Sequence, residues 1–371
     1  MGLRGGGGVA MVQPASAGGR LRSRDIVGMM SGRSLWRIVR GAARAPFDER
    51  FAGSPLAVCW FTNFSCNARC PFCCKAAEIR AGQERWPPLG LTEARALLAR
   101  IRRTVDILYI SGGEPLVHPH IVEILQEARR LAFSAVGMSS NLILLDRRVE
   151  VLEHLDAISV SIHSPDVAVH ARNLALPVAQ AEKAFAHLDQ VVAYARARRA
   201  EAGSRPLTVV VNCVINPDNL DTVLGMVEFT RTRGCLLELV PANDHGGPDA
   251  RLVGNPAYEG LIDALLALRR SGSAPHLAGS TGYYRRIRSF APFRCFPYGV
   301  PNIMPDGSLC TPCDVAGQYA VNVLDHESLK AALAASQSHL GAYPCREGRC
   351  FKAGIIERSR LFGALMRRDG K

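Results

Sequence analysis

The sequence predicts an α/β fold built on a parallel sheet, and two observations support that prediction. From about residue 56 to residue 241, six short apolar runs alternate with stretches of helical periodicity, which is typical of parallel strands joined by crossover helices. A distinctive polar cluster follows each apolar run, and ligand sites of such folds gather at the carboxyl ends of the strands. Six units of this kind form either an open sheet or an incomplete barrel, and the periodicity does not distinguish the two.

The individual elements follow from length and spacing. Short apolar runs bounded by polar residues predict strands, and they cover 57–62, 107–111, 135–139, 157–162, 208–215 and 236–240. Apolar residues three or four positions apart predict helices, and they cover 92–103, 120–131, 147–154, 179–199 and 220–233. Thr92 is the expected N-cap of the first of these helices.

Three cysteines, Cys66, Cys70 and Cys73, lie directly after the first predicted strand. Thiolates at this spacing can hold three irons of a [4Fe–4S] cube and leave the fourth iron without a protein ligand. By the open-site logic that separates catalytic from structural zinc, such an iron can bind and activate a small molecule. Adjacent cysteines rarely reach two corners of one cube, so Cys74 is interpreted as a bystander. A zinc knuckle or a disulfide pair is the alternative, although zinc sites usually combine paired C-x2-C units.

Polar clusters also follow the later strands, and we expect them to meet the cysteines at one edge of the sheet. After the second strand comes a turn whose glycines allow the backbone to approach a ligand closely. The clusters after the second, third and fourth strands are Gly112-Gly113-Glu114-Pro115, Ser139-Ser140-Asn141 and Ser161-Ile162-His163-Ser164.

The cysteine spacing, with Phe72 before the last cysteine and the Gly-Gly-Glu turn at 112–114, resembles the signature of the radical S-adenosylmethionine (radical SAM) enzymes. The resemblance covers about residues 56–350 and implies a partial (β/α)6 barrel of the TIM type. In that family the open iron binds SAM, and an electron from the cluster cleaves SAM to methionine and a 5′-deoxyadenosyl radical. The radical then abstracts hydrogen from the substrate, while the protein supplies binding, orientation and exclusion of water.

The resemblance also implies contacts to SAM at matching positions of this chain. The turn formed by Gly112, Gly113, Glu114 and Pro115 would hold the methionyl amine. Ser139 and Asn141 would approach the carboxylate and the ribose, and Ser161 would contact the ribose. The backbone of Phe72 would lie against the adenine. His163 stands where many relatives carry an acid, so the polar contact at that position is not transferred.

A second group of cysteines lies near the C-terminus. Between its members, Asp306-Gly307 predicts a β-hairpin turn, and a helical pattern covers 328–336. This arrangement resembles the auxiliary-cluster extensions called SPASM, with two extra clusters, or twitch, with one; five cysteines after residue 290 favour one [4Fe–4S] cluster. The expected ligands are Cys295, Cys313, Cys345 and Cys350, with Cys310 as an alternative. A structural zinc ribbon remains open, because the spacing of Cys310 and Cys313 also suits zinc.

The composition limits which classes of partner we expect this protein to bind. The net charge is +12, but nine arginines against three acidic residues in 1–50, and six basic against two acidic residues in 352–371, supply most of it. No aromatic residues interleave with a basic stripe, so nucleic-acid binding is not expected. No stretch approaches a membrane span, and no secretory signal is visible. We therefore expect a cytoplasmic protein, in which the 12 cysteines act as metal ligands or catalytic groups rather than disulfides.

These observations predict four segments: a basic, largely disordered extension over 1–50 with a short amphipathic helix pattern, a radical SAM core over 51–250, a helical linker over 251–290, and an auxiliary-cluster domain over 291–371. The resemblance implies an oxidoreductase or lyase that draws electrons from a donor such as flavodoxin or ferredoxin. Its expected substrate is a small molecule of the sugar, aminocyclitol or nucleoside type, which it would dehydrogenate, epimerise or rearrange. The alternatives are a peptide or protein maturase and, from another class, a non-catalytic iron–sulfur electron carrier.

Overall fold

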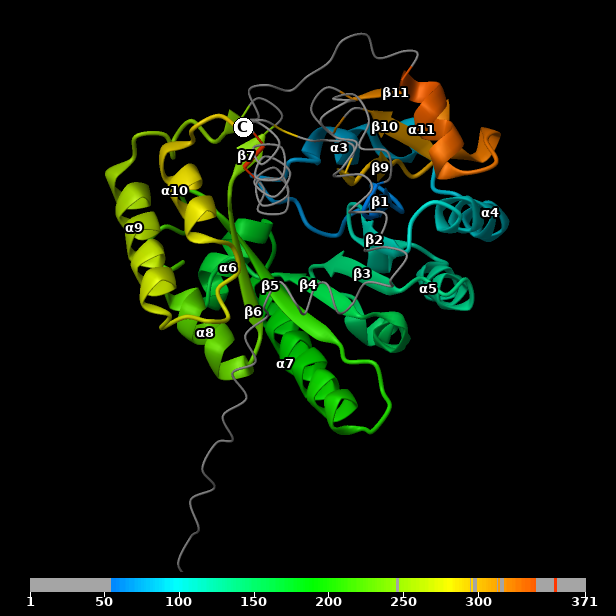
Figure 1. The fold of residues 1–371 in the computed structure, drawn as a ribbon. Coiled ribbons are helices and arrows are strands. Elements are labelled where there is room, and N and C mark those ends of the chain that lie inside the picture. Colours follow the sequence, from blue (N-terminus) through cyan, green and yellow to red (C-terminus); the bar gives the residue numbers. More distant parts are fainter. Residues whose placement is uncertain are drawn as a thin grey trace, which may run out of the picture.

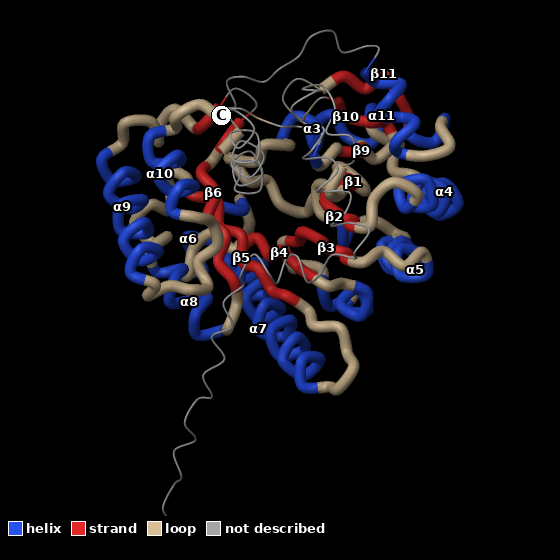
Figure 2. Tube along the Cα trace, in the orientation of Figure 1, coloured by secondary structure: helices blue, strands red, loops and turns tan. Residues whose placement is uncertain are grey.

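The computed structural model describes residues 55–244, 247–293, 295, 299–311, 313, 317–337 and 350–351. At its centre lie six parallel strands, hydrogen-bonded to one another in sequence order. They are β1 (Val58–Phe61), β2 (Ile107–Ser111), β3 (Ala135–Ser140), β4 (Ala157–Ser161), β5 (Thr208–Ile215) and β6 (Leu236–Pro241). Among the strands of the described residues, β5 is the one neighbour of β6, and β6 is not joined to β11, so the curved sheet stays open (Figures 1 and 2). The predicted α/β fold with a partial barrel is confirmed.

Helices lie on the outside of the curved sheet (Figure 1). They are α4 (Leu91–Arg102), α5 (Ile121–Arg130), α7 (Val178–Ala200) and α8 (Gly225–Arg233). Two other helices, α3 (Ala76–Arg85) and α6 (Val167–Leu174), contribute residues to the wall of the interior cavity. Short 3-10 helices complete the crossovers: η1 (Pro115–Val117), η2 (Leu145–Arg147) and η3 (Val149–His154). Apolar faces of α4 and α5, with residues such as Leu97 and Leu125, are fully buried in the main core with the outward side chains of the strands.

The strands alternate between two environments, as the period of two in a strand requires. Along β5 every second residue is buried, and the residues between are partly exposed; β6 has the same alternation. The buried set, with Val211 and Leu239, belongs to the main core, whereas Asn212, Val214 and Val240 line an interior cavity. The two-residue period therefore sends one set of side chains into the barrel.

Three further strands extend the sheet beyond β1. β9 (Asn302–Ile303) pairs parallel with β1, and β10 (Ser308–Thr311) and β11 (Gln318–Asn322) follow antiparallel. β9 and β10 form the predicted hairpin, and Gly307 at its turn has φ +86°, a left-handed conformation that favours glycine. η5 (Val323–Asp325) leads to α11 (Leu329–Gln337), which confirms the predicted helix. The described part of the C-terminal segment thus shares one sheet with the core.

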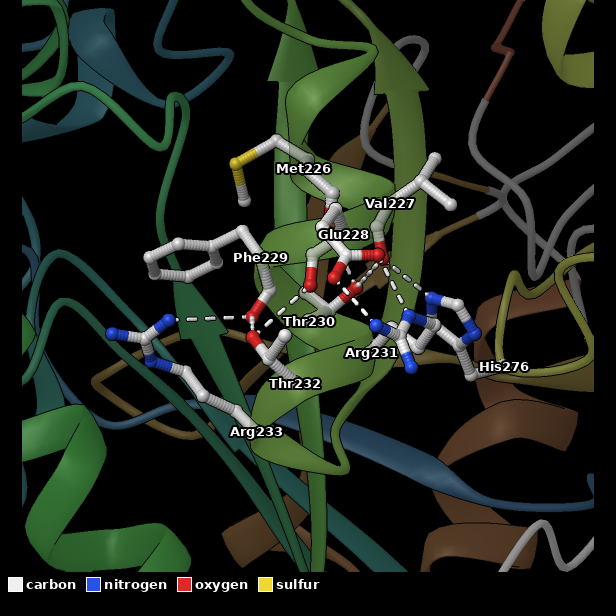
Figure 3. Close-up of polar contacts among 9 residues, drawn as sticks. All are labelled: Met226, Val227, Glu228, Phe229, Thr230, Arg231, Thr232, Arg233 and His276. Carbon is white, nitrogen blue, oxygen red and sulfur yellow. Dashed lines mark hydrogen bonds and ion pairs between the residues drawn. The ribbon is translucent and has the colours of Figure 1, made fainter.

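The segment after β6 is tied back to the core. The two-stranded ribbon β7 (Asn243–Asp244) and β8 (Gly247–Pro248) leads to α9 (Pro256–Ser271) and α10 (Thr281–Ser289), so much of 251–290 is helical. Between α9 and α10, Leu277 forms a bridge with Leu237 of β6. His276 places Nε2 2.8 Å from the carbonyl oxygen of Val227 on α8 (Figure 3).

Some local predictions differ from the structure. α4 begins one residue before Thr92, and its N-cap is Gly90, whose backbone N–H donates to the Glu93 carboxylate at 3.1 Å. The predicted helix 147–154 is two 3-10 segments, and α8 begins at Gly225 rather than at 220. The helical pattern in 33–46 and the extension 1–50 lie outside the described residues.

Candidate active site in the barrel

The loop after β1 places Cys66, Cys70 and Cys73 on the wall of one cavity of about 620 Å³. The amide of Cys73 donates to the carbonyl of Cys70 at 3.2 Å, which folds the loop into a tight turn. The amide of Arg69 donates to the carbonyl of Leu174 at 3.0 Å. The cysteine loop is therefore fixed to the end of α6 as well as to β1.

The three thiols occupy an environment that disfavours the free thiolate. Burial, with the charges of the neighbouring thiols, raises the pKa of Cys70 to about 12 and that of Cys73 to about 11. Burial also raises the pKa of Cys66. Without a bound cation these groups stay protonated at neutral pH, and a metal would deprotonate them on binding.

A [4Fe–4S] cube takes each cysteine on a different iron, whereas a zinc knuckle needs its ligands to converge on one ion. Among the described residues, no group of three or more Cys, His, Asp or Glu side chains is placed to hold a single metal ion. The cluster on Cys66, Cys70 and Cys73 stays a prediction.

The glycine turn after β2 packs against the chain that leads to Cys66. The amide of Gly113 donates to the Asn63 carbonyl at 2.8 Å, and the amide of Glu114 donates to the Ser65 carbonyl at 2.9 Å. A Cβ added at Gly113 would lie 2.3 Å from the Ser65 carbonyl oxygen, and one added at Gly112 would lie 2.5 Å from that of Asn63. Both positions therefore exclude any side chain.

The Glu114 carboxylate is buried and joins two loops. It accepts hydrogen bonds from the amide of Leu116 at 3.1 Å, the hydroxyl of Ser140 at 2.8 Å and the amide of Asn141 at 2.7 Å. Burial outweighs these donors and raises the pKa of Glu114 to about 7. Asn141 in turn donates through Nδ2 to Oδ1 of Asn67 at 2.8 Å. One network thus connects the cysteine loop with the loops after β2 and β3.

The remaining predicted SAM contacts lie around the same cavity, which is lined by Phe72, Gly113, Glu114, Pro115, Ser139, Asn141 and Ser161. Gly112 lies beside it, against Asn63. The hydroxyl of Ser139 is 2.5 Å from that of Tyr109. The ring of Phe72 meets His163 edge to face, with the centroids 4.9 Å apart. Burial lowers the pKa of His163 well below its usual value, so this ring is a neutral support for Phe72.

Sequence comparison assigns this part of the molecule to a family. Residues 61–229 match the model of the radical SAM superfamily. The chain contains a radical SAM domain.

Relatives of this radical SAM protein include enzymes with different substrates. It is 28% identical over 193 residues to the GTP 3',8-cyclase of Chlorobaculum tepidum, covering 49% of this chain and 52% of the relative. It is 27% identical over 183 residues to the PqqA peptide cyclase of Gluconobacter oxydans, covering 48% and 46%. The chain thus spans about half the length of these relatives. Both relatives are enzymes, which supports the prediction that this chain is an enzyme.

The fold comparison agrees with the family. The crystal structure of Streptococcus suis SuiB bound to S-adenosylmethionine aligns with a TM-score of 0.55 at 15% identity, covering 77% of this chain and 68% of SuiB. At that identity the match concerns the fold alone. In the part of the radical SAM protein that the structure describes, no helix is long and apolar enough to cross a membrane.

The radical SAM cavity includes two polar residues that the sequence interpretation missed. Asn212 on β5 and Glu238 on β6 both point into it, and Nδ2 of Asn212 donates to Oε2 of Glu238 at 3.3 Å. The sequence contained a signal for both residues, because each is a strongly polar residue in the middle of an apolar run. Such residues in a strand face the interior of a barrel when the neighbouring positions pack against helices.

The C-terminal cysteines that the structure describes, Cys295, Cys310, Cys313 and Cys350, do not line the radical SAM cavity. Cys310 is buried against Phe61, Phe64 and Trp86, and its thiol is 3.5 Å from the carbonyl oxygen of Cys313. Cys350 precedes Phe351, whose ring centroid lies 6.0 Å from that of Phe293. Cys345 lies outside the described residues. The auxiliary ligand set therefore stays a prediction.

Proposed function

We propose that this protein is a radical SAM enzyme that reductively cleaves S-adenosylmethionine and uses the resulting 5′-deoxyadenosyl radical to abstract hydrogen from a small-molecule substrate. The observation that supports it best is the cavity that Cys66, Cys70 and Cys73 share with the glycine turn and the polar ends of β3 and β4. A non-catalytic electron carrier has no use for a large cavity beside its cluster.

The chain's own residues bind and orient in this proposal. Cys66, Cys70 and Cys73 hold three irons, and the backbone after β2 receives the methionyl amine of SAM. Ser139 and Asn141 approach the carboxylate and the ribose, and Ser161 contacts the ribose. The Phe72 backbone lies against the adenine. The cluster and SAM supply the radical chemistry, and the protein excludes water around it.

Hydrogen bonds within the protein hold Asn141 in position for this role. Its amide is held by Glu114 and its side chain by Asn67, so it has little freedom to rotate. A polar group fixed before the ligand arrives loses less entropy on binding. The network therefore favours a preorganised SAM site.

A small-molecule substrate fits the cavity best. Its volume of about 620 Å³ falls within the range of small-molecule sites. A similar enzyme, GTP 3',8-cyclase, is named for a nucleotide substrate. The reaction class we expect is dehydrogenation, epimerisation or rearrangement of a sugar, aminocyclitol or nucleoside.

A peptide substrate is the second candidate. PqqA peptide cyclase is among the similar sequences, and SuiB has also been crystallised with its precursor peptide SuiA, in a structure that aligns with a TM-score of 0.54. Under either substrate class, we propose one auxiliary [4Fe–4S] cluster on the C-terminal cysteines, and reduction by a flavodoxin or ferredoxin.

Iron analysis tests the proposal first. Anaerobically reconstituted wild type should hold about eight irons per chain, and the Cys66/Cys70/Cys73→Ala triple variant about four. With dithionite and SAM, wild type should release 5′-deoxyadenosine, and the triple variant should release none. Cleavage by the triple variant would refute the proposed function. A triple variant with one zinc and no iron would instead assign the C-terminal cysteines to a zinc ribbon.

A further inference from the structure

The wall of the cavity formed by β5 and β6 has a carboxyl group that the proposed SAM site does not use. Glu238 lies at the middle of β6, on the face that points into the barrel, and is register partner to Asn212 on β5. Asn212 is in turn paired with Ser161 on β4. The cysteine loop and the glycine turn follow β1 and β2, at the other side of the sheet. Glu238 therefore faces the proposed cofactor site from across the cavity.

Tyr109 on β2 is another polar residue of the barrel interior. Its hydroxyl is hydrogen-bonded to that of Ser139. Burial raises the pKa of Tyr109 to about 12, and the charge of Glu238 adds to this effect. A Cβ at Gly137 would lie 2.8 Å from the Tyr109 ring, so the glycine makes room for that ring across β3.

Glu238 lacks a cation among the described residues. The interaction that offsets its burial is the hydrogen bond from Asn212, and burial raises the pKa of Glu238 above its usual value. The other acid in the cavity wall, Glu114, is occupied by three donors of its own chain. A buried carboxylate is costly unless a cation or several donors pair with it. Of the two acids in the cavity wall, Glu238 is therefore the one that can accept hydrogen bonds from a ligand.

We propose that Glu238 recognises the substrate by binding a primary ammonium group. The proposal rests on the function proposed above and narrows its substrate class to amines. An ammonium group carries three donors and the charge that Glu238 lacks. The side-chain amide of Asn212 contacts the carboxylate through its nitrogen, and the oxygen of the same amide is available as a second acceptor. The same chemistry occurs in an amino sugar, an aminonucleoside and a lysine side chain.

Matched amine and hydroxyl or amide ligands test this without knowledge of the natural substrate. The pairs are glucosamine with glucose, 3′-amino-3′-deoxyadenosine with adenosine, and the N-acetylated peptide Gly-Lys-Gly with N-acetylated Gly-Gln-Gly. Binding is measured by calorimetry on reconstituted protein with SAM present, for wild type, E238Q, E238D and E228Q. Glu228 is exposed on α8 and paired with Arg231 (Figure 3), so E228Q is the matched surface control.

We expect wild type and E228Q to bind the amine of at least one pair about 30-fold or more tightly than its partner, as for a desolvated charge pair. E238Q should lose that preference, and E238D should retain part of it. The pair that responds identifies the source of the amine. Glutamine can still accept the hydrogen bond from Asn212, so E238Q should fold.

Three results would overturn the inference. They are equal binding within every pair in wild type, a preference for the amine that survives in E238Q, and a loss of SAM affinity in E238Q as large as its loss of amine affinity. The last would assign Glu238 to the SAM site. Release of 5′-deoxyadenosine without added substrate is recorded for each variant. Its absence in wild type would refute the proposed function, whereas amine binding is measured independently of it.

Discussion

Replacing Gly113 by alanine tests the contact between the glycine turn and the cysteine loop. The added Cβ would lie 2.3 Å from the Ser65 carbonyl oxygen, 2.7 Å from the Ser65 carbonyl carbon and 3.0 Å from that of Phe64. All three are backbone atoms, so no side chain can rotate away. The two loops must separate, and the loop that carries Cys66 moves with them.

The magnitude follows from two contributions. Overpacking costs about 1–3 kcal/mol, and the two inter-loop backbone hydrogen bonds contribute about 0.5–1.5 kcal/mol each. We expect Gly113→Ala to lower the free energy of unfolding by about 2–6 kcal/mol. We also expect it to reduce the iron bound after reconstitution, because the cysteine loop is displaced.

The assay is urea unfolding of the apoprotein followed by circular dichroism, together with iron per chain after reconstitution. Gly260→Ala is the matched control, because Gly260 is exposed in α9 and an added Cβ meets nothing within 4 Å. Helix propensity predicts that this control gains about 1 kcal/mol. If Gly113→Ala unfolds with the wild-type free energy and binds full iron, the reasoning about loop contact is wrong.

Three further predictions follow from the site. Cys70→Ala should abolish 5′-deoxyadenosine release while Cys74→Ala retains it; loss of activity in both would make Cys74 a ligand. Because burial raises the pKa of Glu114 from 4.5 to about 7, its stabilising contribution is complete below about pH 4.5 and is lost as pH rises through about 7. Urea titrations should therefore show wild type losing about 3 kcal/mol relative to Glu114→Gln between pH 4.5 and 7.5, and a pH-independent difference would contradict the burial argument. Cys313→Ala should leave SAM binding by calorimetry unchanged but stop turnover once a substrate is known; normal turnover would make the second cluster dispensable.

The sequence located the strands well, because buried parallel strands are nearly continuous apolar runs. The predicted runs 107–111 and 208–215 coincide with β2 and β5. Helix ends were less accurate, since the first turn of α4 begins at a glycine whose amide is capped by Glu93, a contact that apolar spacing does not reveal. The segment 147–154 carries helical spacing but forms 3-10 turns between β3 and β4.

The sequence predicted which residues form the candidate site, but it did not predict the hydrogen bonds among them. The cysteines and polar clusters were expected at the carboxyl ends of the strands, and the structure brings them to one cavity. The sequence placed Glu114 in a loop that holds SAM, whereas its carboxylate is buried and bonded to Ser140 and Asn141. Partners from different crossovers are set by sheet register, which no local pattern contains.

The sequence by itself determined the α/β class, the six strands of the core and the cysteine loop, because strand length, helical period and ligand spacing are local properties of the chain. Only the tertiary structure decided that the sheet stays open at β6 and that β9 joins the free edge of β1. It also decided that Glu238 faces the cysteines across a cavity. These features depend on the curvature and register of the whole sheet, which bring together residues far apart in the chain.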